Sequence, residues 1–503
     1  MPRDRSSSPP AAVAAPDGRP RRVGMISLGC PKNRVDSEVI LGRLLASGYE
    51  LTSDLEQAET VIVNTCGFID QAKQESIDTL LEVAARKGDG GVRELLVAGC
   101  MAQRYAPELQ AEIPEIDGFL SLDDLRRADE LVALGGAAAA APSRSRALFD
   151  HTDPRRLTTP GYAYLKVAEG CNNPCTFCAI PLWRGRFRSR TIASLVEEAR
   201  QLEAAGAREI CLVAQDTTRY GEDLGLGRHG LLRLVEALLE ATTVPWLRWL
   251  YAYPTTLDRE LLRLMGSEER VCSYLDIPLQ HSHPDVLRAM RRAGDGDRYL
   301  ALLDEARTRA PGIWLRSTFI VGFPGETEEH FAHLERFLER AALDHVGAFT
   351  YSGEEGTPAA EMGARPAAEI ARERQVRLLE RQRPIALERR RSLVGRRLTV
   401  LVEGVCDESE HLLVGRHQGM APEIDGRLLL ADGWGYPGSL VEADIVEAFA
   451  DDLVGHIVGG GRGRRGASDA PAPVGSDGAR AIFAEPGDAL EPAAAQEAPP
   501  SCR

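Results

Sequence analysis

A short apolar run that ends at a cysteine and leads into a helical pattern occurs three times within residues 22–133. The runs are VGMISLGC, TVIVNTCGF and RELLVAGCM, and their cysteines, here the N-terminal triplet, are Cys30, Cys66 and Cys100. Their spacings of 36 and 34 residues match one strand–helix–strand repeat. Such repeats build a parallel sheet in which every strand ends at the same edge. The sequence therefore predicts an α/β domain with three thiols at the edge where open sheets bind ligands.

Any one of these cysteines could simply be packed, because unpaired cysteines are among the most buried residue types. Three of them in register are harder to explain in that way. Neighbouring strands lie roughly 4.8 Å apart, so thiols at adjacent strand ends can converge on one small inorganic group. We therefore expect a bound metal or cluster at this edge, with simple burial as the alternative.

The densest group of cysteines, here the central triplet, is Cys171, Cys175 and Cys178 in the segment VAEGCNNPCTFCAIP. Clustered thiols form disulfides, zinc sites or iron–sulfur clusters. The beginning of the chain, MPRDRSSSPPAAVAAPDGRPRR, lacks the apolar core of an export signal, so we expect a cytoplasmic protein, in which disulfides are rare. Zinc sites usually have four ligands, and no fourth Cys or His lies nearby in the sequence. Three thiolates can instead hold a cubane cluster with one open iron.

Composition divides the chain into several parts. Residues 1–21 and 458–503 are rich in Gly, Pro, Ala and charge, which predicts disordered tails. The low-complexity patch LGGAAAAAPSRSRA predicts a linker. No apolar run approaches the roughly 18 residues of a membrane span, so we expect no membrane partner. The parts predicted between the tails are an N-terminal domain at 22–133, the linker at 134–156, a central domain at 157–391 and a small β domain at 392–457.

Strand-like runs alternate with helical patterns through the central domain and predict six βα units. The runs are YAYLKVAEG, EICLVAQDT, PWLRWLYAYP, SYLDIPLQH, IWLRSTFIVGFPG and HVGAFTYS. One helix is expected to start at a capping box formed by Ser194 and Glu197 and to stop at Gly206. The basic run AAEIARERQVRLLERQRPIALERRRSLVG predicts a helix with a solvated charged face that Pro384 kinks or ends.

The spacing C-x3-C-x2-C after a first strand, with Phe177 just before the last cysteine, resembles the cluster motif of radical S-adenosylmethionine enzymes. The motifs SLGCPKN, NTCGFI, VAEGCNNPCTFC, AQDTTRYG, DIPLQH, GFPGET and APEIDG narrow the resemblance. Over about residues 22–455 the chain resembles the methylthiotransferases, in the branch that modifies an aspartate of a small-subunit ribosomal protein. The transfer RNA branch of that family typically carries another tripeptide in place of PKN.

The resemblance implies a parallel-sheet α/β domain, a partial TIM-like (βα)6 radical barrel and a C-terminal TRAM β-barrel. It implies a 4Fe-4S cluster on the central triplet that binds S-adenosylmethionine, and a second 4Fe-4S cluster on the N-terminal triplet that carries sulfur. Reduction of the first cluster would yield a deoxyadenosyl radical. A radical is needed because no side-chain base could remove the hydrogen on the substrate's β-carbon as a proton. A low-potential electron donor of flavodoxin or ferredoxin type is expected.

Five further residues are expected to contact S-adenosylmethionine. Phe177 belongs to the cysteine motif, and Gln215 follows the second strand, at the barrel face that carries functional groups. Arg316 lies on the fifth strand. Gly322 and Gly325 follow it and would let the backbone approach an adenosyl group, although they could equally shape a turn.

Two other groups receive no functional assignment. His281 and His283, in DIPLQHSH, are expected to be structural, as single barrel histidines usually are. Four cysteines lack partners at metal spacing: Cys211, Cys272, Cys406 and Cys502.

The C-terminal domain bears on the choice of partner. By resemblance it is a TRAM domain, a module often used to bind RNA. Residues 395–452 hold four basic and twelve acidic side chains, a net charge of −8 in a chain of net charge −15. Such a surface repels phosphates and attracts a basic ribosomal protein, unless its acidity serves solubility alone. We expect that protein substrate and no RNA binding by this domain; the alternatives are a transfer RNA methylthiotransferase and a non-enzymatic metal scaffold.

Overall fold

The computed structural model describes residues 19–88, 91–141 and 144–458. Most of the two tails predicted by composition lies outside the described residues. The chain divides into two compact units. Nearly all of the first two ranges form one, here the N-terminal unit, and the third range with residues 68–70 forms the other, here the barrel unit. Within the described ranges, no helix is long and apolar enough to cross a membrane.

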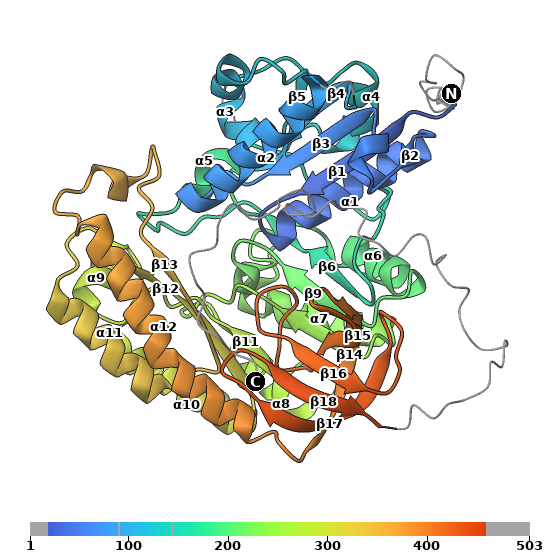
Figure 1. The fold of residues 1–503 in the computed structure, drawn as a ribbon. Coiled ribbons are helices and arrows are strands. Elements are labelled where there is room, and N and C mark those ends of the chain that lie inside the picture. The colour runs from blue at the N-terminus through green and yellow to red at the C-terminus, as the bar shows by residue number, and fades with distance from the viewer. Residues whose placement is uncertain (1–18, 89–90, 142–143, 459–503) are drawn as a thin grey trace. The chain divides into compact units, whose positions relative to one another are not determined.

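The N-terminal unit is built on a five-stranded parallel sheet (Figure 1). Its strands are β1 (Arg22–Ser27), β2 (Glu50–Leu51), β3 (Thr60–Thr65), β4 (Glu94–Ala98) and β5 (Gly118–Leu120). Its helices are α1 (Pro31–Ala46), α2 (Asp70–Gly88), α3 (Gly99–Glu112) and α4 (Ala128–Ala133). The strand order is β2-β1-β3-β4-β5, and every neighbouring pair is parallel. The strand–cysteine–helix repeats predicted this α/β arrangement, which is confirmed.

Both faces of this sheet are covered. Successive side chains of a strand point to opposite faces. Val61 and Val63 of β3 share a core cluster with residues of α2 and α3. Ile62, which is also fully buried, faces the other side, where α1 packs against β1 and β3. Burial on two faces is what a parallel sheet with crossover helices requires.

The barrel unit begins with six parallel strands that form two three-stranded sheets, β6-β9-β10 and β11-β12-β13. They are β6 (Tyr162–Lys166), β9 (Glu209–Val213), β10 (Trp246–Trp249), β11 (Tyr274–Asp276), β12 (Trp314–Val321) and β13 (His345–Thr350). A parallel bridge between Leu247 and Val271 lies between the two sheets. These strands match the six predicted βα units.

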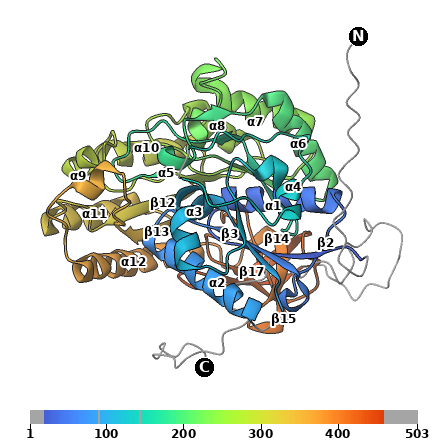
Figure 2. The same ribbon diagram turned by 90° about the horizontal axis from the view of Figure 1, so that it is seen from above.

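Helices lie outside the strands of this partial barrel (Figure 2). They are α6 (Ile192–Ala204), α7 (Gly230–Ala241), α8 (Arg259–Ser267), α9 (Pro284–Ala289), α10 (Gly296–Arg309), α11 (Glu328–Ala341) and α12 (Ala368–Arg391). A short helix, α5 (Ile180–Trp183), and a two-stranded ribbon of β7 (Ala168–Glu169) and β8 (Arg188–Ser189) follow β6.

The start of α6 differs from the prediction. Thr191 is its N-cap, and the Thr191 side chain accepts a hydrogen bond from the Ser194 N–H. The predicted cap at Ser194 is wrong by about one turn, because the Ser194 hydroxyl is buried in the helix and accepts from Arg190 at 3.0 Å. The predicted stop at Gly206 is confirmed: the residue follows the C-cap and has a φ of 99°.

The C-terminal part of the barrel unit is a closed antiparallel-rich barrel, coloured orange to red in Figure 1. Its strands are β14 (Arg397–Cys406), β15 (Ser409–Arg416), β16 (Leu428–Asp432), β17 (Leu440–Ala448) and β18 (Leu453–Ile457). They close in the order β14-β15-β16-β18-β17, with β17 returning to β14. The small β-barrel predicted from the turn-rich sequence is confirmed.

This closed barrel packs against the amino ends of the central strands through buried charges. Arg416 of β15 forms an ion pair with Glu209, the first residue of β9, and a second with Glu403 at 2.6 Å. The other carboxylate oxygen of Glu209 pairs with Arg248 at 2.7 Å. Removing one member of such a buried group typically costs about 3–5 kcal/mol, because the remaining charge is then buried without its partner.

A loop of the closed barrel, residues 421–426 (APEIDG), also reaches the central strands. Asp425 accepts a hydrogen bond from the Tyr274 hydroxyl at 2.6 Å. Glu423 accepts one from the Tyr164 hydroxyl at 3.1 Å. Separated from the central strands, the segment 392–457 would expose these polar groups. Binding by this domain is therefore best measured on the full chain.

Helix α12 runs without a break through Pro384, so the predicted end at this proline is wrong, and the alternative of a kink stays a prediction. Pro384 is exposed, and water can therefore reach the carbonyl oxygen that loses its helical partner. The predicted solvated charged face is confirmed, because most of the charged side chains of α12 are exposed, and the other face of the helix is buried. Its buried residues are Ala371, Arg374, Leu378, Gln382, Ala386 and Arg390.

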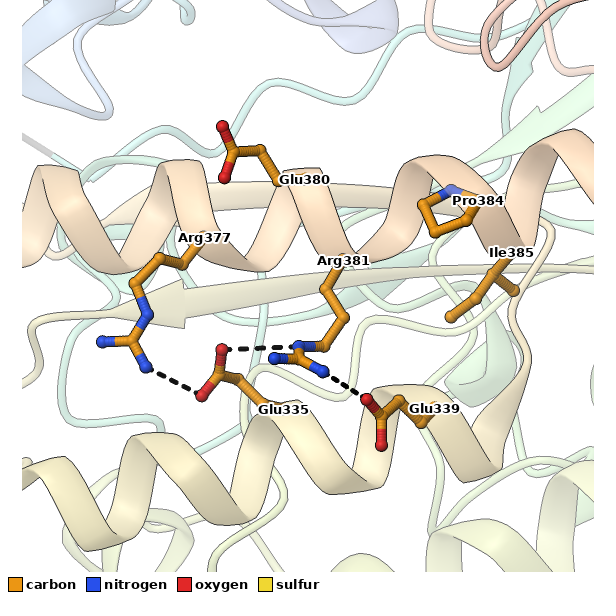
Figure 3. A pocket seen from close by; sticks show the side chains of 7 residues that line it. All are labelled: Glu335, Glu339, Arg377, Glu380, Arg381, Pro384 and Ile385. Carbon is orange, nitrogen blue, oxygen red and sulfur yellow. Dashed lines mark hydrogen bonds and ion pairs between the residues drawn. The ribbon is translucent and has the colours of Figure 1, made fainter.

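Ion pairs join α12 to α11 along one edge. Arg377 lies 2.9 Å from Glu335, and Arg381 pairs with both Glu335 and Glu339. These residues line a surface groove of about 520 Å³. Figure 3 shows the ion pairs and shows Glu380 pointing away from them. None of the site residues predicted from the sequence lines this groove. We assign it no function.

Two buried histidines lie where the closed barrel meets the central strands. In its neutral form, His345 can donate from Nε2 to the Gly419 carbonyl oxygen at 2.8 Å and accept at Nδ1 from Arg390 at 3.3 Å. His417 packs its ring against Trp314, with 4.9 Å between centroids. Burial lowers the pKa of His345 to about 4 and that of His417 to about 3.

We expect the free energy of unfolding to fall as the pH drops from about 6.5 towards 4. Unfolded histidine takes up a proton near pH 6.5, whereas His345 and His417 stay neutral in the fold, so acid favours the unfolded state. For His345 the loss is on the order of 3 kcal/mol by about pH 4, at roughly 1.4 kcal/mol per pKa unit. Chemical denaturation of the full chain at neutral pH and near pH 4 measures this loss in the free energy of unfolding.

His345→Gln keeps a donor for the Gly419 carbonyl but cannot titrate, so it should reduce the pH dependence of stability. His411→Gln is the matched control, because His411 is an exposed histidine of the same closed barrel. Equal pH dependence in the wild type and in His345→Gln would show that His345 is not the group that titrates.

Candidate functional site

The central triplet lies on a loop that leaves the central sheet after β6. The ribbon of β7 and β8 closes this loop at its base, with Ala168 opposite Ser189. Gly170 has a φ of 80°, and a Cβ there would lie 2.3 Å from the backbone oxygen of Arg186. Only glycine fits this position, and the chain turns there directly into Cys171.

Of the central triplet, Cys171 is buried, and Cys175 and Cys178 are partly exposed. The Asn173 N–H donates to the Cys171 sulfur at 3.4 Å, and the Cys178 N–H donates to the Cys175 carbonyl oxygen at 3.3 Å. Burial raises the pKa of Cys171 to about 11 and raises that of Cys178 well above its usual range. Metal binding here must therefore release protons from the thiols.

A buried carboxylate fixes both ends of this loop. Glu169 pairs with Lys166 at 2.8 Å and with Arg184 at 3.0 Å. It also accepts a hydrogen bond from the Gln215 side chain at 2.8 Å. Burial would raise the pKa of Glu169, but Arg184 and Lys166 hold it well below its usual range. The ionised carboxylate thus ties the loop to the end of β9.

The segment after β9 holds the loop at a second point. Asp216 accepts hydrogen bonds from the side chains of Asn173 at 2.7 Å and Thr218 at 2.6 Å. Gln215, predicted to contact a cofactor, uses its amide nitrogen on Glu169, and its buried carbonyl oxygen has no partner among the residues described. That oxygen can accept a bond from a bound group, so cofactor contact by Gln215 stays a prediction.

Three other predicted contact residues lie in or near turns of the barrel unit. Gly322 adjoins α12: a Cβ there would lie 2.5 Å from the Cβ of Ala371. Gly325 has open space at its Cα, and its N–H donates to the Ala364 carbonyl oxygen at 3.0 Å. Phe177 packs against a small core cluster formed by Val286, Met290, Phe323 and Ala359. Cofactor contact by these residues stays a prediction.

Arg316, also predicted to contact a cofactor, lies early in β12. Its guanidinium is 3.2 Å from Asp425 of the closed barrel and 3.5 Å from Asp276. The structure therefore gives Arg316 two carboxylate partners within the contact that joins the two barrels. Its predicted role at the cofactor has no support from these contacts.

The N-terminal triplet lies at the carboxyl ends of the neighbouring strands β1, β3 and β4. Cys30 is the N-cap of α1, Cys66 follows β3, and Cys100 is in the first turn of α3. The strand order reverses between β1 and β3, and doubly wound sheets bind ligands at such a point. Gly29 lies against the second thiol, since a Cβ there would be 3.2 Å from the Cys66 sulfur. The three cysteines thus share one edge of the sheet.

Asn33, the last residue of the PKN tripeptide, holds the three cysteine loops together. Its side chain is fully buried and donates to the carbonyl oxygens of Leu28 at 3.1 Å and Thr65 at 3.0 Å. The Cys100 thiol lies 3.7 Å from the Asn33 amide oxygen. One side chain therefore contacts the segments that carry all three cysteines of the N-terminal triplet.

Comparison with known proteins gives the family. Residues 22–121 match the uncharacterized protein family UPF0004, residues 165–338 the Radical SAM superfamily and residues 394–458 the TRAM domain. The ribosomal protein uS12 methylthiotransferase RimO of Anaeromyxobacter sp. (strain Fw109-5) is 45% identical over 91% of this chain and 97% of its own. The RimO of Trichlorobacter lovleyi is 43% identical over 87% of this chain and 98% of its own. The chain belongs to the RimO family of methylthiotransferases.

The similarity of this chain to solved structures is weaker than its similarity to the RimO relatives. The radical S-adenosylmethionine methyltransferase TsrM from Kitasatospora setae, solved with cobalamin and a [4Fe-4S] cluster bound, gives a TM-score of 0.49 at 16% identity. The match covers 68% of this chain and 74% of TsrM. This likeness adds nothing to the RimO family assignment.

The histidines of this RimO-family chain have contacts that agree with a structural role. His281 is fully buried, 3.7 Å from Glu326. His283 caps α9 by accepting the Asp285 N–H at Nδ1, and His330 likewise accepts the Thr327 N–H. Ligand atoms of His283, Asp285 and His330 lie within 4.8 Å of one another. We assign no metal there, because an imidazole that accepts at Nδ1 carries its proton on Nε2.

Sequence reasoning missed three side chains at the central triplet. Glu169 stands two residues before Cys171, so its position next to the motif could have suggested it. Asn173 lies inside the motif. Arg292 lies 117 residues beyond Cys175 and still brings a guanidinium nitrogen within 3.7 Å of its sulfur. No spacing rule marks Arg292, because only the folded barrel brings it to the loop.

Proposed function

We propose that the chain attaches a methylthio group to the β-carbon of an aspartate in ribosomal protein uS12 by a radical S-adenosylmethionine mechanism. Relatives named for action on uS12 are 43–45% identical to it over 87–91% of its length. The similarity spans the UPF0004, Radical SAM and TRAM matches together. That continuous similarity is the observation that carries the proposal.

The central triplet suits an iron–sulfur cluster with one open iron. It offers three thiols on one closed loop and no fourth cysteine, and the buried guanidinium of Arg292 lies beside it. Cys171, Cys175 and Cys178 would hold the cluster, and Glu169 and Gln215 would keep the loop in place. When bound, the cluster and S-adenosylmethionine supply the radical that removes a hydrogen atom from the substrate.

The N-terminal triplet suits a second cluster. Its three cysteines end neighbouring strands at the edge where such sheets bind ligands, and Asn33 braces their loops. We propose that this second 4Fe-4S cluster carries the sulfur to be transferred. A flavodoxin- or ferredoxin-type donor of low potential is proposed as the source of electrons.

The proposed function is tested with the anaerobically reconstituted full chain, S-adenosylmethionine, a reductant and either purified uS12 or unmodified transfer RNA. We expect uS12 to gain the mass of one methylthio group in place of one hydrogen, localised to an aspartate by peptide fragmentation. Transfer RNA should be unchanged. Modification of transfer RNA with uS12 unchanged would move the chain's activity to the other branch of the family.

The acidic closed barrel is proposed to contact the basic substrate. Several of its acidic side chains are not available, because Glu403, Glu423 and Asp425 are engaged with Arg416 or with the central strands. Asp407 and Glu410, at the hairpin between β14 and β15, are exposed. They remain able to attract lysines and arginines of a ribosomal protein.

We expect Asp407→Lys/Glu410→Lys to weaken binding of the full chain to uS12 about tenfold at low salt. Each exposed charge pair is worth up to about 1 kcal/mol, and roughly 1.4 kcal/mol is a tenfold change in Kd. Binding isotherms at two salt concentrations measure the effect, which should shrink at the higher one.

Glu236→Lys/Glu240→Lys is the matched control, because it makes the same charge change at exposed positions of α7. It should leave uS12 affinity near the wild-type value. Equal weakening by both double variants would show that net charge alone, and not this hairpin, attracts the substrate. Tight binding of transfer RNA by the wild type would contradict the exclusion of RNA.

A further inference from the structure

Arg292 is a buried cation next to the central triplet. It is 8% exposed, and its Nη1 lies 3.7 Å from the Cys175 sulfur. Its Nη2 donates to the Pro278 carbonyl oxygen at 2.5 Å, and the guanidinium lies 4.3 Å from the centroid of the Tyr253 ring. Its backbone N–H donates to the Leu287 carbonyl oxygen at 2.8 Å. These contacts aim the side chain at the cysteine loop.

Arg292 interacts electrostatically with the buried carboxylate of Asp216, but it forms no ion pair with it. Its nitrogens form no ion pair with a carboxylate of the described residues, and its buried Nε has no hydrogen-bond partner there. Two other buried arginines of this unit are paired: Arg184 with Glu169, and Arg374 with Glu326. A buried charge without a directly bound partner is costly, so the position of Arg292 beside three thiols calls for a negative group at that place.

We propose that Arg292 is the counter-ion of the cluster held by the central triplet and that it raises the reduction potential of that cluster. The inference rests on the proposed function, in which three thiolates hold a cluster here. Thiolate ligands make such a cluster negatively charged, and reduction adds one more negative charge. A fixed guanidinium within hydrogen-bonding distance of a ligand sulfur stabilises the reduced form more than the oxidised form.

The proposed role of Arg292 differs from the roles of two other cations near the central triplet, Lys166 and Arg184. Those two cations share the Glu169 carboxylate, and their charge is compensated mainly by it. Arg292 instead directly contacts a neutral aromatic ring, a carbonyl oxygen and a thiol, and it interacts with the Asp216 carboxylate without an ion pair. It is therefore the cation whose removal changes the field at the cluster without breaking an ion pair of the protein.

The test measures the midpoint potential of one cluster by anaerobic redox titration followed by electron paramagnetic resonance. The full chain is used with the N-terminal triplet replaced by alanine, so that the central triplet alone binds iron. Arg292→Gln removes the charge but keeps donors, and Arg292→Lys keeps the charge. Arg291→Gln is the matched control, because it removes a charge at the adjacent, exposed residue.

We expect the midpoint potential to shift to more negative values in Arg292→Gln, and to stay close to the parent value in Arg292→Lys and Arg291→Gln. If Arg292→Gln folds but retains no iron while Arg292→Lys retains it, the counter-ion role is also supported. An unshifted potential in Arg292→Gln, or the same shift or iron loss in Arg292→Lys, would overturn the inference. Absence of a cluster from the parent chain would instead refute the proposed function.

Discussion

Cys171→Ala is expected to lower the rate of S-adenosylmethionine cleavage by roughly a thousandfold or more, a change of about 4 kcal/mol in the barrier. Cys171 opens the cysteine loop, and alanine removes one of only three sulfur ligands while leaving the backbone turn at Gly170 intact. Without that ligand, a cluster cannot be held with one iron open for the cofactor. Deoxyadenosine released by the anaerobic, reduced protein measures the rate, and iron analysis measures the cluster.

Cys211→Ala is the matched control for this experiment. Cys211 is a fully buried cysteine of β9, and its replacement removes the same sulfur atom from a position with no predicted ligand role. It should retain cleavage and iron, with a modest loss of stability from the small cavity. Wild-type cleavage by Cys171→Ala would show that the central triplet does not bind the catalytic cluster.

Cys66→Ala is expected to separate the two halves of the reaction. Cleavage of S-adenosylmethionine should stay within about twofold of the wild-type rate, because the central triplet lies in the other compact unit and is unchanged. Methylthiolation of uS12 should be lost, because the sulfur-carrying cluster lacks a ligand. Iron content should fall to about half, as expected for loss of one of two equal clusters. Product chromatography and mass spectrometry of uS12 measure the two activities.

Cys406→Ala is the control for Cys66→Ala, since Cys406 is a buried cysteine of the closed barrel with no predicted ligand role. It should support both activities. Normal methylthiolation by Cys66→Ala would contradict the assignment of a second cluster to the N-terminal triplet. Loss of both activities would indicate that the two triplets do not act separately.

The parts of the fold that local patterns dictate were predictable from the sequence. Apolar runs followed by helical patterns predict parallel strands, and the spacing of Cys30, Cys66 and Cys100 predicts neighbouring strand ends. The central triplet could be recognised in the sequence, because the spacing of cysteines within one loop is a local property. Its closure by β7 and β8 adds the reason why the loop is held in one shape.

Long-range contacts were not predictable in the same way. The charge count of residues 395–452 treats every acidic side chain as exposed, yet Asp425 is buried against Tyr274 and Arg316 in the fold. Arg316 was predicted as a cofactor contact from its place on the fifth strand, and the sequence did not reveal that Asp425 of the closed barrel is one of its partners. The position of Arg292 beside the central triplet could not be predicted, because no sequence motif marks an arginine in the segment between two helices.

Helix α12 shows how packing overrides local propensity. Its charges predicted a solvated face, which the structure has, and its proline predicted a kink or an end, whereas the helix continues through Pro384 and buries Leu378 and Ala386 on its other face. The tripeptide PKN gives a similar lesson. Asn33 was useful as a family marker, and its contacts show that it braces the cysteine loops.

The most direct test of the account compares ribosomal proteins and transfer RNA, by mass spectrometry, from cells with and without this gene. We predict that uS12 lacks the methylthio group on its aspartate when the gene is absent. The wild-type gene should restore that modification and the Cys171→Ala gene should not, while methylthiolated nucleosides of transfer RNA stay at the same level throughout. Unchanged uS12 together with loss of methylthiolated nucleosides from transfer RNA would contradict the account.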